Sequence, residues 1–384
     1  MESLKRVLFT ALIIQTAPVA EAQLIVPLPP WAQLNGIHTS VPFLTIAPDA
    51  RSAGMGDLGV ASRADAYSQH WNPAKYVFSK KRSGFGGSYT PWLKNRFSGV
   101  YHGYLSSYYK INRKNSLRGS FRYFSLGTST TLTTIGGTVL SQYHPKEFAI
   151  DAGYSHMITD KVSGGIVLRY IHSNLVKRIV SPSGQMTKPG TSFAGDLSLY
   201  YRYEFKVGEK DALWAFGLNI SNVGTPISYT GDAEKVPIPT NLRLGTSFNY
   251  YITDHKSMPI SADLNKLMVP TPAVYTIDTV TGEPILLRGH APSESVILGM
   301  LRSFYDAPGI ARTDGTYSVA VEEFHEHASK GNRKYFTLGL GVRLNPILLD
   351  ISYLLPTNGQ NSPLSNALRI TLSSYFGSFP TLPT

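Results

Sequence analysis

From about residue 83 onward, hydrophobic and polar residues alternate along the chain with a period of two. One such segment places Phe148, Ile150, Ala152 and Tyr154 opposite Asp151, Gly153 and Ser155. Because side chains two residues apart share a face of a β-strand, each such segment predicts a strand with one apolar and one polar face. The pattern predicts strands near 83–92, 97–109, 116–127, 147–158, 162–175, 192–205, 212–224, 241–252, 257–267, 294–305, 310–321, 333–344, 346–355 and 366–376.

The length and spacing of these segments favour a membrane barrel over a soluble β-sandwich. Predicted strands of about 10 to 14 residues exceed the five or six that are usual in soluble sheets, and Tyr and Phe recur near their ends, as at membrane interfaces. The connections alternate between short and long, for example Lys110–Asn115 and then Thr128–Lys146. Outer-membrane barrels have short periplasmic turns and long outer loops. We therefore predict an all-β fold, a transmembrane outer-membrane β-barrel of about 14 antiparallel strands over residues 83–384.

Composition narrows the function classes. Charged residues make up 16% of the chain, against about a quarter in soluble proteins, and a mean hydropathy of −0.09 argues against a polytopic helical membrane protein. The absence of cysteine excludes disulfides, thiolate nucleophiles and Cys-ligated metal sites. A net charge of +11 indicates an anionic partner, either nucleic acid, membrane lipid or lipopolysaccharide.

The N-terminus has the three parts of a secretory signal peptide. Lys5 and Arg6 precede an apolar run over 7–17, and Ala20-Glu21-Ala22 forms an A-x-A cleavage site. We expect residues 1–22 to be removed, with cleavage between Ala22 and Gln23. Export then argues against a nucleic-acid partner, and together with the predicted barrel it places the protein in the outer membrane.

Residues 23–82 lack the alternating pattern and are rich in small residues. Glycines at 54, 56 and 59 argue against a strong helix and permit close backbone approach. A phosphate-binding loop is excluded because no G-K-[ST] ending follows. We expect this segment to be periplasmic or to pack as a plug inside the barrel mouth.

The same segment carries a family resemblance. The run LTIAPDARSAGMGD at 44–57 and the run SQHWNPAK at 68–75 closely resemble the PorV (LptO) family, the outer-membrane barrels of the type IX secretion system of Bacteroidota. That family is distantly related to the FadL fatty-acid transporters, and the general patterns A-R-x-x-G-M-G and W-N-P-A are shared with PorQ. The residues that carry the resemblance are Asp49, Arg51, Gly54, Gly56, Asp57, Trp71, Asn72 and Pro73.

The resemblance implies a carrier without enzymatic activity. Members bind the C-terminal signal domain of secreted cargo at the translocon barrel and transfer it to a cell-surface sortase complex that attaches it to lipopolysaccharide. No cofactor is implied. Two alternatives stay open, a FadL-like channel for hydrophobic small molecules with a movable hatch, and a lipopolysaccharide deacylase that would need a Ser and a His at the lipid-facing rim.

Two predicted outer loops are candidates for docking cargo or a partner barrel. Both are rich in Pro and apolar residues, which suits recognition of extended or β-rich segments. The alternative is that they fold over their own barrel mouth. The candidate residues are Pro237, Ile238, Pro239, Met268, Val269, Pro270, Pro272 and Tyr275.

Charged residues within the predicted plug and lumen have structural and functional interpretations. Asp49, Arg51 and Asp57 could pair to hold the plug or could line a transport path, and Asn72-Pro73 sets a turn. Arginines on the polar strand faces, with Asp151, Asp196, Glu204 and Asp350, indicate a structural network or an anion-selective pore. They are Arg118, Arg122, Arg169, Arg202, Arg243, Arg343 and Arg369.

The sequence signals for metal binding and catalysis are weak. Glu322–His327 contains two histidines two residues apart, but no third histidine lies nearby, so a solvated acidic loop is favoured over a metal site. No G-x-S-x-G motif is present, and we predict no catalytic, cofactor-binding or metal-binding residues. Lysines and arginines of the short turns could meet anionic lipid head groups.

Overall fold

The computed structural model describes residues 37–91, 99–127, 130–133, 139–175, 186–230, 235–253, 256–271, 274–277, 284–288, 295–304, 309–311, 317–319, 335–344, 346–356 and 367–378. The predicted signal peptide and the Glu322–His327 tract lie outside these residues. No helix in the described part of the chain is long and apolar enough to cross a membrane.

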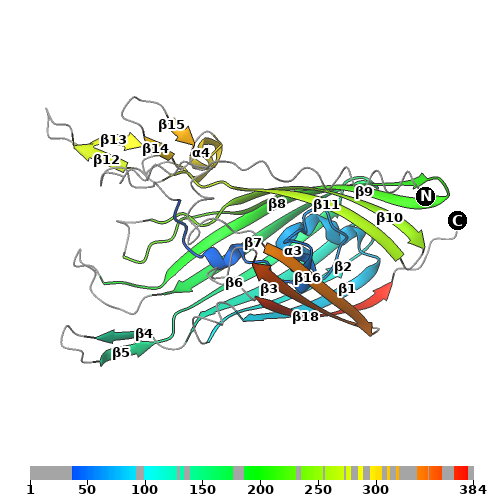
Figure 1. Cartoon of the computed structure of the whole chain (residues 1–384), viewed down its shortest axis with the longest axis horizontal. Coiled ribbons are helices and arrows are strands. Elements are labelled where there is room, and N and C mark those ends of the chain that lie inside the picture. The colour runs from blue at the N-terminus through cyan, green and yellow to red at the C-terminus, as the bar shows by residue number, and fades with distance from the viewer. Residues whose placement is uncertain are drawn as a thin grey trace, which may run out of the picture.

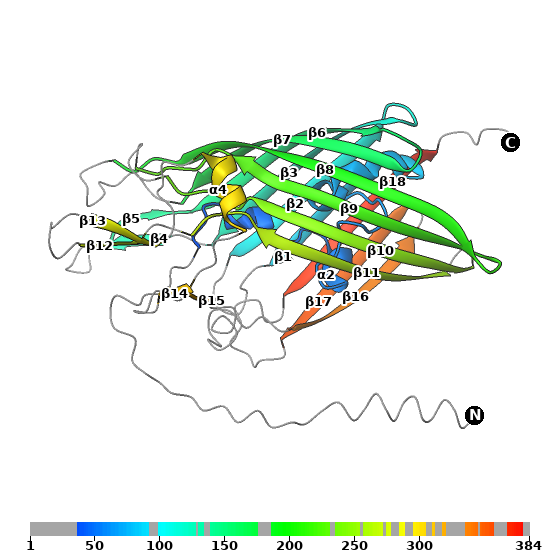
Figure 2. The ribbon, with the colours of Figure 1, turned by 90° about the horizontal axis from the view of Figure 1, so that it is seen from above.

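Twelve antiparallel strands form one sheet that curls into a barrel wall (Figures 1 and 2). The first strand β1 pairs with the last strand β18, and β11 and β16 are the two ends of the sheet. In spatial order the strands are β11 (Lys256–Leu267), β10 (Asn241–Thr253), β9 (Lys210–Gly224), β8 (Gly190–Val207), β7 (Val162–Asn174), β6 (Lys146–Met157), β3 (Asn115–Leu126), β2 (Val100–Lys110), β1 (Lys81–Pro91), β18 (Leu368–Ser378), β17 (Ile347–Pro356) and β16 (Tyr335–Leu344).

Burial along the strands is the reverse of that in a soluble protein. Outward-facing Leu168, Leu264 and Leu340 are 66% to 74% exposed, whereas inward-facing Arg122 and Asp151 are at most 2% exposed. Lipid is the solvent that favours such a wall, with apolar side chains outside and polar ones inside. The predicted outer-membrane barrel is therefore confirmed.

Twelve of the predicted strands are present in this sheet, and two are not. The predicted strand at 294–305 is wrong, because this segment forms the helix α4 (Val296–Arg302), capped by the Ser295 hydroxyl, which accepts from the Leu298 N–H. The predicted strand at 310–321 is also wrong as a barrel strand. Its described residues form part of a small two-stranded sheet of β14 (Gly309–Ala311) and β15 (Tyr317–Val319), outside the 12-stranded sheet.

The inner segment, residues 37–79, lies inside the curve of the sheet (Figure 1). It contains only short helical turns, as its glycines suggested. These are η1 (Pro42–Thr45), α2 (Ala50–Gly54), α3 (Ser68–Trp71) and η2 (Pro73–Phe78).

The two ends of the barrel differ. Strands β2 and β3, β6 and β7, and β8 and β9 are joined by short turns at one end. The opposite end carries α4 and the two hairpins β4 (Thr130–Thr133) with β5 (Val139–Tyr143) and β12 (Val274–Ile277) with β13 (Pro284–Arg288) (Figures 1 and 2). We call these the turn end and the loop end. By the rule for outer-membrane barrels, the turn end faces the periplasm.

Candidate functional site

Asp49 and Trp71 hold the two halves of the inner segment together. The Asp49 carboxylate caps α2 by accepting from the Ser52 N–H at 2.8 Å and accepts from the Trp71 indole N–H at 2.7 Å. Asp49 is fully buried, and burial, followed by the charge of Asp65, raises its pKa to about 6. The two family-motif runs are therefore in direct contact.

The expected pairing among Asp49, Arg51 and Asp57 is not the one observed. Arg51 instead forms an ion pair at 3.2 Å with Asp65, a residue that the sequence analysis did not single out. Gly56 and Asp57 adopt positive φ angles of 81° and 60° and form the turn after α2. Gly54 lies against the wall, since a Cβ there would be 2.8 Å from the Gly339 Cα on β16.

Asn72 and Pro73 make the predicted turn and also bind the wall. The Asn72 side chain accepts from the Ala74 N–H, while its amide donates to the Leu199 carbonyl on β8 at 2.9 Å. The Pro73 carbonyl accepts from the Ser155 hydroxyl on β6 at 2.8 Å. Glycine at 217 on β9 leaves the necessary room, since a Cβ there would be 2.8 Å from the Asn72 amide nitrogen.

Further polar contacts attach the inner segment to the end strand β11 and to the paired strands β1 and β18. Asp263 on β11 accepts from the N–H groups of Gly59 and Val60 at 2.7 and 3.0 Å. The Tyr67 hydroxyl lies 2.8 Å from the carbonyls of both Gly87 on β1 and Leu372 on β18. The inner segment is thus hydrogen-bonded around the circumference of the wall.

Two buried cations stabilise the segment by donating to backbone carbonyls. The Lys75 ammonium donates to the Gly59 carbonyl at 2.6 Å, and burial lowers its pKa to about 8. Arg243 donates to the His70 carbonyl at 2.8 Å. Burial, reinforced by Arg243 and Arg122, lowers the pKa of His70 well below its usual range, so the ring is neutral.

The predicted lumen network is present at the centre of the barrel. Arg169 lies 2.7 Å from Asp151 and 2.9 Å from Asp196, and Arg122 lies 3.8 Å from Asp151. Arg118, Arg243, Arg369 and Asp350 are also buried, whereas Arg202 and Glu204 form a largely exposed pair. The ion pairs of Arg169 with Asp151 and Asp196 favour the structural interpretation of this network.

An apolar layer fills the space beneath the loop end. Phe43 of the inner segment stacks on Phe124 with 6.1 Å between ring centroids. This layer contains Val41, Phe43, Leu44, Val100, Phe124, Ala149, Ile171, Ala194, Ile227 and Ile238, all of them buried.

The candidate docking loops take part in covering this layer. Ile238 is 2% exposed, Met268 5% and Val269 2%, and Pro239 is buried. This burial favours the second alternative, in which these loops fold over their own barrel mouth. Pro237 and Pro270 are half-buried, and Pro272 and the side chain of Tyr275 lie outside the described residues.

An exposed apolar surface on α4 and the two residues after it was not predicted from the sequence. Ile297 is 66% exposed, Leu301 57% and Phe304 51%, while Gly299 is buried close to Pro270. An exposed apolar patch of this kind at the rim of a barrel is typical of an interaction site.

No group of three or more His, Asp or Glu side chains in the described ranges is placed to hold a metal ion.

Comparison with known proteins agrees with the sequence motifs. A family model described as type IX secretion system protein PorV matches residues 30–274. No curated protein sequence matches this chain. The Pseudomonas putida toluene transporter TodX is similar in structure, with a TM-score of 0.40 and 12% identity over 84% of this chain and 96% of that chain. A Pseudomonas aeruginosa FadL homologue has a TM-score of 0.35 and 11% identity over 86% and 98%.

Proposed function

The chain belongs to the PorV family of the type IX secretion system, and on that premise we propose that it binds the C-terminal signal domains of secreted cargo at the outer membrane. In this role it has no chemistry of its own. It receives cargo at the translocon barrel and delivers it to the sortase complex that attaches cargo to lipopolysaccharide. The mature chain begins near Gln23, with residues 23–82 as a plug and 83–384 as the barrel.

The observation that carries this proposal is the way in which the interior is filled. The inner segment is hydrogen-bonded to strands β8, β11 and β18 of the wall, and the centre of the lumen holds the buried Arg169 network. A barrel filled in this way is a rigid scaffold, and recognition by such scaffolds resides in the loops that they hold. The function is therefore assigned to the loop end.

Among the described residues of the loop end, the surface of α4 and the residues up to Phe304, here called the α4 surface, is the part best suited to bind a protein. Its exposed Ile297, Leu301 and Phe304 belong to the residue classes that become buried at the centre of protein interfaces. The helix contacts the chain after β11, because Gly299 approaches Pro270. We assign cargo or translocon docking to α4 and the adjoining loop, and this assignment replaces the buried Ile238 and Met268.

Affinity purification tests the proposal. The tagged chain is isolated from native outer membranes, and mass spectrometry identifies what accompanies it. We expect a very large barrel, a sortase or proteins that share a C-terminal β-domain. The double variant Ile297→Asp, Leu301→Asp should lower their recovery about tenfold, the effect of losing interface anchors. Met186→Asp is the matched control, since Met186 is 59% exposed at the loop end outside α4.

The outcomes separate the candidate functions. Recovery of the chain alone, with bound fatty acid, would favour the FadL-like channel, in which ligand replaces the side chains of the apolar layer. Recovery of partners that is unaffected by the α4 variant would keep the carrier role and refute the α4 assignment.

A further inference from the structure

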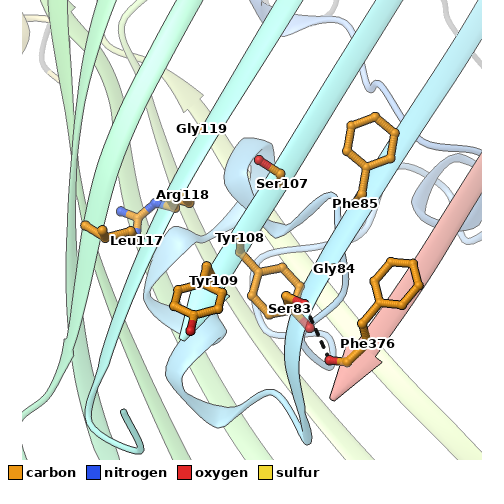
Figure 3. A pocket seen from close by; sticks show the side chains of 10 residues that line it. All are labelled: Ser83, Gly84, Phe85, Ser107, Tyr108, Tyr109, Leu117, Arg118, Gly119 and Phe376. Atoms are coloured by element: carbon orange, nitrogen blue, oxygen red, sulfur yellow. Dashed lines mark hydrogen bonds between the residues drawn. The ribbon is translucent and has the colours of Figure 1, made fainter. Parts of the chain in front are cut away.

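A groove of about 400 Å³ lies on the outer wall across β1, β2, β3 and β18 (Figure 3). Phe85 and Phe376 stand on one side of it, and Tyr109 and Leu117 on the other. These four side chains face outward and are 47% to 53% exposed. The groove therefore opens toward the lipid and is separate from the plugged interior and from the loop end.

Strand register explains the hollow. Ser107 on β2 pairs with Gly119 on β3, and Gly119 pairs with Ala152 on β6. This row of small residues lies between two rows of large ones, with Leu105 and Phe121 toward the loop end and Tyr109 and Leu117 toward the turn end. The small side chains at Ser107 and Gly119 therefore leave the wall recessed between these two rows of large ones.

The rim below the groove carries charge of one sign. Lys80, Lys81 and Arg82 lead into β1, and Arg113 and Lys114 lie in the turn from β2 to β3, all exposed. The register brings the two groups side by side, since Ser83 pairs with Tyr109. Arg82 stacks over the Tyr109 ring at 5.2 Å and donates to its hydroxyl at 2.7 Å, which fixes a cation at the mouth of the groove.

Among the short turns, a purely basic rim is found next to the groove. No Asp or Glu occurs between Asp65 and Glu147. The other short turns mix both signs, with Asp160 beside Lys161 and Glu209 beside Lys210. The basic rim is therefore placed over the groove and is not a general property of the turn end.

We propose that this groove binds an anionic glycerophospholipid of the periplasmic leaflet, with its phosphate at the basic rim and one acyl chain in the groove. Ser107 lines the groove and lies farther from the basic rim than Tyr109, which Arg82 contacts. The Ser107 and Ser83 hydroxyls can donate to ester oxygens there, and Phe85 and Phe376 provide apolar contact along the chain. The proposal requires the periplasmic placement of the turn end and is independent of cargo binding.

Native mass spectrometry of the full-length protein in mild detergent tests it. Phosphatidylglycerol or phosphatidylethanolamine is added, and bound lipid is counted. Wild type should retain phosphatidylglycerol preferentially. Ser107→Phe fills the groove and should abolish retention. Arg82→Gln should lower phosphatidylglycerol retention about fivefold, the effect of one charge near a lipid surface, and should reduce the preference over phosphatidylethanolamine.

Matched variants keep the test specific. Ala262→Phe enlarges an exposed outward residue on β11, and Lys210→Gln removes a cation from the turn between β8 and β9. Both should retain lipid as wild type does, and heat-dependent mobility on a gel shows that each variant is folded. The proposal is overturned if Ser107→Phe retains as much phosphatidylglycerol as Ala262→Phe does. It is equally overturned if the bound species is lipopolysaccharide alone or a polypeptide.

Discussion

Replacing Arg169 with methionine should strongly destabilise the barrel, because this side chain neutralises two buried carboxylates. Arg169 is 4% exposed, Asp151 2% and Asp196 5%. Methionine keeps the apolar stem but removes the charge and its hydrogen bonds. Asp151 would then retain Arg122 at 3.8 Å, and Asp196 would retain the Asn222 N–H at 2.8 Å.

The expected magnitude follows from the burial of the group. Removing one partner of a buried ion pair costs about 3 to 5 kcal/mol, and each 1.4 kcal/mol is about tenfold in an equilibrium constant. The unfolding equilibrium constant should therefore rise by about two to three and a half orders of magnitude. Arg202→Met is the matched control, since Arg202 pairs with Glu204 at 3.3 Å with the two side chains 31% and 67% exposed. This variant should lower the free energy of unfolding by about 1 kcal/mol.

Reversible urea unfolding in lipid vesicles, followed by tryptophan fluorescence, measures both variants. Adding Asp196→Asn to Arg169→Met should recover part of the loss, because one uncompensated carboxylate is then removed. The reasoning fails if Arg169→Met costs no more than Arg202→Met. It also fails if the added Asp196→Asn destabilises the protein further.

Three further variants examine the inner segment. Burial raises the pKa of Asp49 from 3.8 to about 6, so its contribution to stability is fully present below about pH 4 and is lost as pH rises through about 6. Asp49→Asn should remove this decline from urea titrations, and an unchanged pH slope would show that another group causes it. Gly217→Ala places a Cβ 2.4 Å from the Val60 carbonyl. It should lower the free energy of unfolding by about 1 to 3 kcal/mol and should speed proteolytic cleavage of the inner segment. Gly103→Ala, with 4.0 Å to its nearest neighbour, should do neither. Trp71→Phe should lower the free energy of unfolding by about 1 to 3 kcal/mol in wild type and by less in Asp49→Asn. If the two effects add to within about 0.5 kcal/mol in the double variant, Asp49 and Trp71 are not coupled.

The wall was predictable from sequence because the alternation of apolar and polar residues within each strand shows which face meets lipid and which faces inward. Outward Leu338 and Leu340 and inward Thr371 and Ser373 follow the period-two pattern residue by residue. The segment at 294–305 misled because a short apolar run fits either a strand or a helix. The signal that could have decided it was Ser295, a good helix N-cap before Val296.

The contacts of the inner segment were not predictable in the same way. Asp263 binds the Gly59 N–H across 204 residues of sequence, and that pairing exists only once the sheet has curled. The motif residues were identified, yet the partners of Arg51 and of the candidate loops were not. Burial of Ile238 likewise depends on Phe43 and Ile227 arriving at the same place from distant parts of the chain.

The position of Tyr67 has a consequence for the order of assembly. Its hydroxyl reaches Gly87 and Leu372, which are register partners across the seam between the first and last strands. Ala66, next to it, donates its N–H to the Tyr375 hydroxyl. A segment near the start of the chain thus reaches its final contacts only after the last strand has been synthesised, exported and zipped onto the first. Tyr67 therefore binds both strands of that seam. Incompletely inserted chains would keep the inner segment accessible to periplasmic chaperones and proteases, whereas in finished barrels it would be covered.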